Sequence, residues 1–553
     1  MTVSILALIA FLLANLAFAS WRRPGRPARD FISAGPVSGA SEYALAGRSL
    51  AGPALLATLA ASNLSAFTVF GVSGASYRLG WAFFPVMAFG TALMAVSFAV
   101  VGVPLRRMSA RRGWTTPADF IADRFASPWL GRAFSGLSLL YTIPYLAIQA
   151  GAGGTLIAGM TGIPRVAASA LLVALVAAYV WRGGMRSVAR TDILQLAALL
   201  VLAVAAGMIV VVSAGPSGAA AKVAADAGRM SRAGVGGTLG WLPLLGYYIL
   251  WSFADPMFPH FIQRFYAARS DKALLSSMIA YPVVAVLVFL PVCTIGVLGS
   301  AMVPGLAGAA SDGIFTVLAQ ALSGPVWGPV FALAALAALM STMDSQLLSC
   351  ATMIGSDLLP KRFRGKRASQ AAAVLLAALG WIVAIRPPAS ILDFLNKTAF
   401  PGYATLMPVA LMGIYTPRLG RWTAAATLLA GTMLVLAESA GLFSPPVPAA
   451  LFNAGAQLLV IMSGAFIRDL FRRTKAGTLE AGSGSSSRVL ASPRLVVSIL
   501  AIILFAVLGV DFWNFGSVSS VLPGLPGWVV YHACLTLALC GVFWFVARAI
   551  PAE

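Results

Sequence analysis

Charged residues, histidine and cysteine are all scarce in this sequence of 553 residues, and each shortage excludes a class of protein. Only 10% of the residues are charged and 59% are hydrophobic, whereas a soluble domain has about 25% charged residues. This composition excludes a soluble globular protein and a disordered one. The two histidines argue against a haem protein or a multi-histidine metal enzyme. The four cysteines lie in apolar runs, with neither a disulfide framework nor zinc-binding spacing.

Long apolar runs are abundant, and about 20 such residues cross the hydrocarbon core of a bilayer as a helix. We therefore predict an all-α integral membrane protein with about fifteen transmembrane helices. The expected spans are 2–20, 51–76, 82–105, 133–160, 166–182, 191–213, 240–263, 273–300, 325–356, 369–386, 391–416, 422–442, 447–467, 495–511 and 525–548.

The first run resembles a signal peptide in one respect, because residues 17–19 look like a cleavage site. A signal peptide has a basic segment before its apolar run, but here the basic cluster follows the run. We interpret residues 2–20 as a retained helix that enters the membrane from outside.

The excess of basic over acidic residues, 38 against 17, gives a formal charge of +21. If the N-terminus is outside and the fifteen spans alternate, 31 basic residues fall in cytoplasmic segments and 6 outside. Cytoplasmic loops are enriched in Lys and Arg. The charge therefore marks a cytoplasmic face, predicts a cytoplasmic C-terminus, and implies no nucleic-acid partner.

A polar segment at residues 61–68 interrupts the second span, and Gly71 and Gly74 follow it. Polar side chains beside glycines suit a helix that unwinds within the membrane and frees carbonyl oxygens next to a cavity. The alternative is a continuous helix whose small residues allow close packing against a neighbour.

The ninth span carries small and hydroxyl residues with helical spacing on one face. These residues are Ala338, Ser341, Thr342 and Ser345, with Asp344 beside them. Hydroxyls together with freed carbonyls form a cage of neutral oxygens that suits sodium better than a divalent ion, which prefers several carboxylates. Alternatively, the hydroxyls bond only to carbonyls of their own helix.

The seventh span contains Trp251 and Asp255, followed by Pro256 and Pro259. Each proline removes a helical hydrogen bond, so we predict a second broken helix, which would line a substrate site with aromatic rings and a carboxylate. The alternative is a kinked helix in which Asp255 pairs with a basic residue. Lys397, in the eleventh span, could bind a substrate carboxylate, neutralise Asp255 or pack at a helix break.

Five motifs in the same order resemble those of the sodium/solute symporter family. They are found at residues 41–50, 116–125, 183–195, 259–265 and 340–345. The resemblance covers most of the first thirteen spans and implies the leucine-transporter fold, in which two inverted five-helix repeats would comprise spans 2–6 and 7–11.

The resemblance also implies a set of functional residues. Asp192 matches a family aspartate that is thought to help sodium leave towards the cytoplasm. The implied sodium ligands are the carbonyl oxygens of Ala61, Leu64 and Ala338 and the hydroxyls of Ser341 and Thr342.

Several departures from the family bear on the substrate. Asn63 stands where proline symporters have an aspartate, Trp251 matches a proline-symporter tryptophan, and Asp255 replaces an aromatic residue. Residues 67–68 lack the glutamine by which sugar transporters hold their ligand, which disfavours sugars. We expect an organic acid or amino acid as solute. The expected substrate-binding residues are Asn63, Ser65, Trp251, Asp255 and Lys397.

The sequence thus predicts a sodium-coupled symporter in the cell membrane, with Na⁺ as coupling ion, no organic cofactor and no obligate protein partner. The alternative is a transporter-like sensor that acts with a separate signalling protein. A membrane enzyme is disfavoured because no nucleophile elbow, P-loop or histidine cluster is present.

The chain is expected to divide into five segments. These are an N-terminal helix and cytoplasmic loop (1–50), an inverted-repeat transporter core (51–416), two additional helices (417–467), a cytoplasmic linker with a Gly/Ser run at 482–487 (468–494) and a two-helix extension (495–553).

Overall fold

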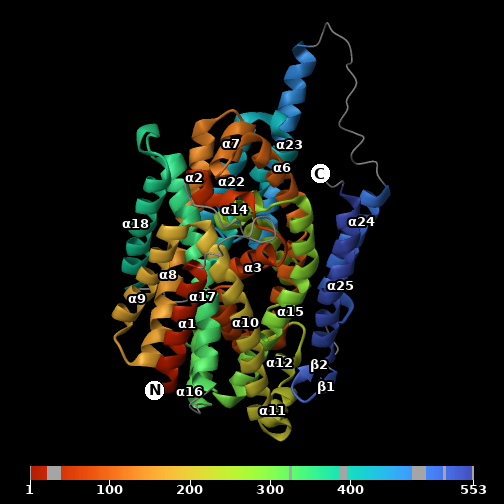
Figure 1. Cartoon of the computed structure of the whole chain (residues 1–553). Coiled ribbons are helices and arrows are strands. Elements are labelled where there is room, and N and C mark those ends of the chain that lie inside the picture. The colour runs from red at the N-terminus through yellow and green to blue at the C-terminus, as the bar shows by residue number, and fades with distance from the viewer. Residues whose placement is uncertain are drawn as a thin grey trace.

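The computed structural model describes residues 2–20, 39–322, 327–385, 395–475, 493–514 and 519–550. These residues form a bundle of helices (Figure 1), and the strands among them are the short pair β1 (Ser520–Leu522) and β2 (Leu525–Pro526). The predicted all-α membrane architecture is confirmed at this level.

Eleven helices in the described ranges are long and apolar enough to cross a membrane. The predicted count of about fifteen remains a prediction, because the second, seventh and eleventh expected spans are each divided into shorter helices. One of the eleven is the helical run Phe67–Arg112, which contains several shorter helices. The other ten are α1 (Thr2–Ser20), α8 (Pro128–Thr161), α9 (Arg165–Gly183), α10 (Met185–Ala214), α15 (Asp271–Met302), α17 (Trp327–Met353), α18 (Lys366–Ile385), α22 (Gly420–Ser439), α23 (Ala449–Lys475) and α25 (Gly527–Ala549).

Shorter helices connect and complete the bundle. They are α2 (Ala40–Leu45), α3 (Gly52–Asn63), α4 (Val72–Leu79), α5 (Phe83–Met94), α6 (Val103–Arg112), α7 (Pro117–Arg124), α11 (Ala220–Ala225), α12 (Ala227–Met230), α13 (Trp241–Ala254), α14 (Pro259–Ala267), α16 (Ile314–Ala321), α20 (Phe400–Ala404), α21 (Met407–Tyr415) and α24 (Pro493–Val510).

The second expected span is broken between α3 and α4, as the first of the two sequence interpretations predicts. Leu64 leaves the helical conformation, with φ −86° and ψ 107°. Side chains then bind the backbone amides that the break frees: Ser65 Oγ accepts the N–H of Phe67 at 3.1 Å, and Gln149 Oε1 accepts that of Ala66 at 2.9 Å. The break is stable because these buried amides have partners.

The seventh expected span is also broken. Helix α13 ends at Ala254, a 3₁₀ turn covers Asp255–Met257, and α14 begins at Pro259. Helices α3 and α14 run in opposite directions, because the residue before α3 bonds the residues after α14, while Asn63 at the end of α3 bonds Asp255, which precedes α14. The amide of Leu50 donates to the Ala267 carbonyl at 3.1 Å, and the amide of Arg269 donates to the Leu50 carbonyl at 2.7 Å.

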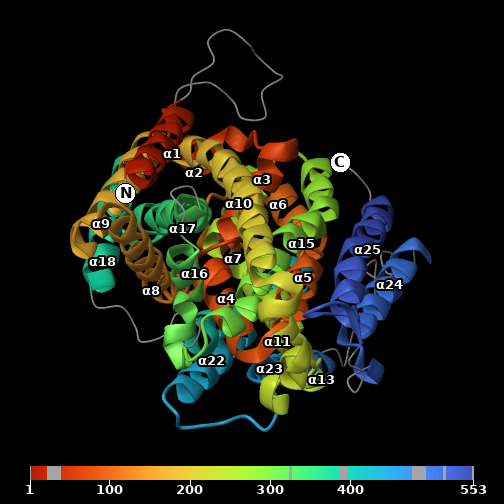
Figure 2. The same ribbon diagram turned by 90° about the horizontal axis from the view of Figure 1, so that it is seen from below.

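The C-terminal helices α24 and α25 lie at one edge of the bundle, and α25 packs against α15 and α5 (Figure 2). The Tyr248 hydroxyl of α13 donates to the Gly509 carbonyl at 2.8 Å, and Trp81 Nε1 donates to the Gly524 carbonyl at 2.7 Å. Helix α23 continues to Lys475, past residue 468, where the sequence predicts that the linker begins. The Gly/Ser run at 482–487 lies outside the described residues.

Candidate functional site

The five predicted sodium-ligand oxygens lie together where α17 crosses the break after α3. The Ser341 hydroxyl donates to the carbonyls of Ala61 at 2.8 Å and Ala338 at 3.0 Å. The Thr342 hydroxyl lies 3.1 Å from the Leu64 carbonyl. Both hydroxyl-bearing side chains are buried.

This cage consists of neutral oxygens, and a hydroxyl can turn its lone pairs toward a cation. Within the ranges that the structure describes, no group of three or more His, Cys, Asp or Glu side chains could hold a metal ion. The cage therefore suits a small monovalent cation better than a divalent one, which prefers carboxylates. The sequence interpretation missed one nearby oxygen, the Ser62 carbonyl, which lies 3.4 Å from the Thr342 hydroxyl. This carbonyl could have been inferred, because Ser62 lies between the predicted ligands Ala61 and Leu64 where the helix ends.

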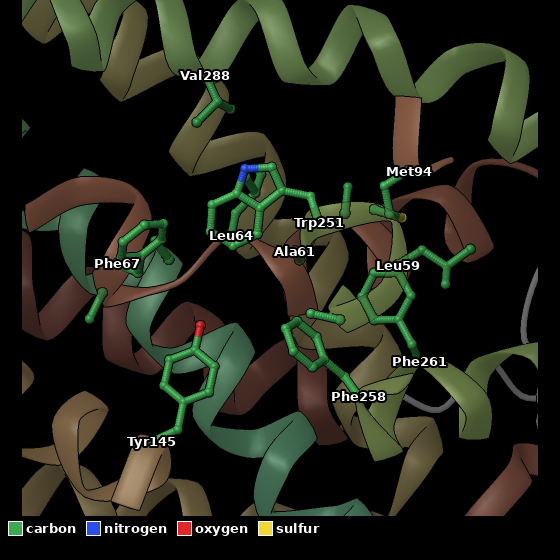
Figure 3. Packing of buried hydrophobic residues seen from close by; sticks show 14 of the residues in the cluster. Leu59, Ala61, Leu64, Phe67, Met94, Tyr145, Trp251, Phe258, Phe261 and Val288 are labelled. Atoms are coloured by element: carbon green, nitrogen blue, oxygen red, sulfur yellow. The ribbon is translucent and has the colours of Figure 1, made fainter. Parts of the chain in front are cut away.

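A small cavity lies beside the ion cage, between the two breaks, and has a volume of about 20 Å³. Its size leaves room for about one water molecule. Figure 3 shows Phe67, Tyr145, Trp251 and Phe258 around this region, near Ala61 and Leu64. The polar side chains that line the cavity are Asn63, Thr68, Thr91, Tyr145 and Asp255.

Asn63 joins the two broken helices. Its Nδ2 donates to Asp255 Oδ2 at 3.0 Å and to the Tyr281 hydroxyl at 2.8 Å. Asp255 is 3% exposed, and its carboxylate bonds the Asn63 amide rather than a basic residue. The alternative in which Asp255 forms a salt bridge finds no partner among the described residues.

Trp251 lines the same cavity, whereas Ser65 does not line it but bonds to the lining residue Tyr145. The Tyr145 hydroxyl of α8 donates to Ser65 Oγ at 2.6 Å. Trp251 Nε1 donates to the Val86 carbonyl at 3.0 Å, so the indole N–H is directed away from the cavity. Trp251 therefore presents ring surface to the cavity, 5.1 Å from the Phe400 ring between centroids.

Lys397, like Ser65, is a predicted substrate residue that does not line the cavity. Its side chain is exposed, and its carbonyl accepts a hydrogen bond from the Ser439 hydroxyl of α22 at 2.9 Å. The sequence placed Lys397 within a span, but the structure has a π-helical turn at Leu395–Ala399, which departs from the regular α-helical spacing. A helical count through the segment could therefore not locate the side chain.

Asp192, on α10, lies in a buried charged network adjacent to the ion cage. It accepts hydrogen bonds at Oδ2 from the Thr58 hydroxyl and from Arg264 Nη2, the latter at 3.1 Å. Arg264 also donates to Ser345, whose hydroxyl donates to the Ser341 carbonyl at 2.7 Å. One chain of hydrogen bonds therefore connects Asp192 to the backbone of the cage.

Asp344 extends this network on α17. It accepts at Oδ2 from the hydroxyls of Tyr179 at 2.7 Å and Thr191 at 3.2 Å. The sequence interpretation named Asp344 but missed Arg264, although that arginine lies within the motif at 259–265. In the sequence, Arg264 resembles the basic residues that mark the cytoplasmic end of a transmembrane helix. The structure instead buries its side chain in the network.

The ends of the two broken helices at the predicted cytoplasmic face are held together. Arg48 donates to the Ser109 hydroxyl at 2.6 Å, to the Trp114 carbonyl at 2.8 Å and to the Tyr266 carbonyl at 3.0 Å. Arg106 and Arg107 of α6 both bind Asp271, at 2.5 and 2.7 Å. These contacts join the segment before α3 to the end of α14, and α6 to the start of α15.

Comparison with known proteins gives a consistent result. The model of the sodium:solute symporter family matches residues 43–431. A sodium/pantothenate symporter of Haemophilus influenzae is 26% identical over 440 residues, 77% of this chain and 88% of that protein. A sodium/proline symporter of Escherichia coli is 28% identical over 438 residues, 73% of this chain and 84% of that protein.

Among solved structures, a substrate-bound, outward-open Na⁺-coupled sialic acid symporter has the same fold. The TM-score is 0.67 at 18% sequence identity, and the match covers 85% of this chain and 97% of that one.

Proposed function

The chain belongs to the sodium:solute symporter family and couples sodium to the transport of a small organic solute, and we propose that it imports an organic acid or amino acid by alternating access. It is a multi-span membrane protein of a family of transporters. We place it in the cell membrane, with its N-terminus outside and its C-terminus in the cytoplasm, on the distribution of basic residues.

The coupling ion is assigned to the cage formed by the carbonyls of Ala61, Leu64 and Ala338 and the hydroxyls of Ser341 and Thr342. The observation that carries this assignment is that both hydroxyls of α17 reach carbonyls freed at the break after α3. Sodium in this cage would bind α3 to α17. The ion therefore stabilises the conformation in which the break has its observed shape.

The solute is assigned to the cavity lined by Asn63, Trp251 and Asp255. Asn63 provides the link to sodium, since its backbone lies between the carbonyls of Ser62 and Leu64 and its side chain holds Asp255. Sodium and solute therefore order the same segment of chain. Each ligand lowers the cost of ordering that segment for the other, which is the reciprocal coupling that symport requires.

The architecture assigned to the core is two inverted five-helix repeats. The opposite directions of the two broken helices, which begin the proposed repeats, support it. Half-helix ends that meet near the middle of the membrane are typical of such transporters. Asp192 is assigned to sodium release. Hydrogen bonds connect it to the cage through Arg264 of α14, the helix that ends at the predicted cytoplasmic face.

The experiment is uptake by the purified full-length protein in liposomes, with an inward sodium gradient and with potassium as the matched control. A membrane potential of 100 mV adds about 2.3 kcal/mol per charge moved inward, which corresponds to roughly fiftyfold accumulation of a neutral solute carried with one sodium ion. Sodium-independent uptake would contradict sodium coupling, and the absence of any accumulation would favour a sensor that signals through a separate protein.

A further inference from the structure

The charge of the solute cavity narrows the class of solute. Among the described side chains that line it, Asp255 is the one with a charge, and the others are amide, hydroxyl, thioether or aromatic groups. A buried carboxylate is costly unless a cation or several hydrogen bonds compensate it. The carboxylate of Asp255 has a neutral partner, the Asn63 amide at 3.0 Å.

Neither Arg264 nor Lys397 supplies a cation to Asp255. Arg264 binds Asp192, the Thr58 carbonyl and Ser345, and the Lys397 side chain is exposed. An anionic solute in this cavity would therefore meet a carboxylate and no opposite charge from the described residues. Two like charges in contact repel each other more strongly at such a buried site than they would in water.

The aromatic side chains suit a positive charge. The ring centroids of Phe67 and Trp251 are 5.9 Å apart, those of Phe67 and Phe400 are 5.3 Å apart, and those of Phe258 and Phe400 are 6.1 Å apart. Aromatic faces attract cations, and boxes of such rings recognise ammonium groups. Because the indole N–H of Trp251 is bonded to Val86, the indole offers ring surface and no donor to an anion.

We propose that Asp255 selects a solute that carries a positively charged nitrogen, held between this carboxylate and the rings of Phe67, Trp251 and Phe400. The solute is then an amino acid, a betaine or another ammonium compound, and carboxylic acids without such a nitrogen are rejected. This inference rests on the proposed function, and it decides between the two solute classes considered there.

Matched pairs of probes test the inference on the unmodified full-length protein. Proline is compared with cyclopentanecarboxylate, and glycine betaine with 3,3-dimethylbutyrate, so that each pair differs in the charged nitrogen. Pantothenate is included as an acid whose nitrogen is an uncharged amide. Thermal stabilisation of the detergent-solubilised protein in sodium buffer measures binding, and uptake into liposomes measures transport.

We expect at least one nitrogen-bearing probe to bind at least tenfold more tightly than its carbon partner, a difference of about 1.4 kcal/mol. The inference is overturned if neither nitrogen-bearing probe binds, or if a carbon partner or pantothenate binds as tightly as the better of the two. These comparisons use the unmodified protein, so they do not depend on the folding of a variant.

Asp255→Asn then tests the residue itself. It should weaken binding of the preferred nitrogen-bearing probe at least tenfold and leave the sodium-induced thermal shift in place. Asp357→Asn is the matched control, because Asp357 is a buried carboxylate that binds the hydroxyls of Thr116 at 2.9 Å and Ser135 at 2.8 Å, away from the cavity. Equal binding by Asp255→Asn and the unmodified protein would overturn the assignment.

The sodium dependence of uptake separates this inference from the proposed function. Sodium-driven uptake of a carbon partner would overturn the inference and leave symport intact. Uptake of a nitrogen-bearing probe that is selective but independent of sodium would support the inference and contradict the proposed coupling.

Discussion

Ser341 and Thr342 are adjacent in sequence, and both direct a hydroxyl from α17 to the carbonyls released after α3. Adjacent residues of a helix point about 100° apart, so two neighbouring hydroxyls reach one cage only because the facing chain is irregular. A regular α3 would keep its carbonyls bonded within the helix. The proposed ion site therefore depends on the pair and on the break together.

The double substitution Ser341→Ala with Thr342→Ala should abolish sodium-stimulated uptake, because it removes both side-chain ligands of the assigned cage. The measurement is initial uptake rate against sodium concentration in liposomes. Ser349→Ala is the matched control, since Ser349 is buried on the same helix and its hydroxyl bonds to the Gln346 carbonyl at 3.1 Å. Undiminished sodium stimulation in the double variant would contradict the assigned site.

Lys397→Met should leave the KM for the solute within about twofold of the unmodified value. The sequence alone allowed a role in binding a substrate carboxylate, and that role predicts a raised KM. The exposed side chain and the contact of the Lys397 backbone with Ser439 favour the smaller effect. Uptake against solute concentration measures it, and a KM raised tenfold would return Lys397 to the substrate site.

At the scale of elements, the break after α3 is held by a neighbouring helix. Gln149 of α8 accepts the Ala66 amide at 2.9 Å, and Tyr145, one turn earlier, donates to Ser65 at 2.6 Å. Two side chains of one helix thus support the irregular segment on which both proposed sites depend. The sequence predicts the break, since polar residues and glycines cluster in an apolar run, but it gives no sign of this support.

Gln149→Leu should destabilise the protein by about 1–3 kcal/mol, because it leaves the buried Ala66 amide without an acceptor. The measurement is the thermal unfolding temperature in detergent, and the apparent sodium affinity should fall with it. Thr155→Val is a control on the same helix, since its hydroxyl bonds only to the Gly151 carbonyl, one turn earlier, at 3.1 Å. Equal behaviour of the two variants would show that the break does not need Gln149.

The sequence predicted the elements of this fold better than the contacts between them. The hydropathy pattern located the long helices of the described ranges, and the prolines near Asp255 marked the second break. Partners such as Tyr281 and Arg264 were missed because they come from elements more than 200 residues from Asn63 and Thr58. Lys397 was assigned to the substrate cavity, which it does not line, for a different reason. A charged residue within an apolar run gives no information about the direction of its side chain when the backbone there is irregular.

At the scale of the whole molecule, the C-terminal pair α24–α25 is joined to the core by a buried ion pair. Arg232 Nε lies 3.5 Å from Asp511 Oδ2, and both side chains are at most 1% exposed. The Arg232 guanidinium also lies 4.9 Å from the centroid of the Trp528 ring, and Trp528 Nε1 donates to the Met230 carbonyl at 2.9 Å. The extension is therefore packed as part of the transporter rather than attached only by the expected linker.

This attachment predicts how the molecule responds when one charge is removed. Arg232→Met should lower the free energy of unfolding by about 3–5 kcal/mol, because it leaves Asp511 buried without its partner, whereas Arg232→Met with Asp511→Leu should recover much of the loss. Arg229→Met is the control, since Arg229 pairs with Asp226 at a partly exposed site, where an ion pair contributes about 1 kcal/mol or less. Thermal unfolding of the full-length protein in detergent measures all three. If the double variant were no more stable than Arg232→Met, the loss would come from the arginine's packing on Trp528, and the extension would be held by ring contacts rather than by charge.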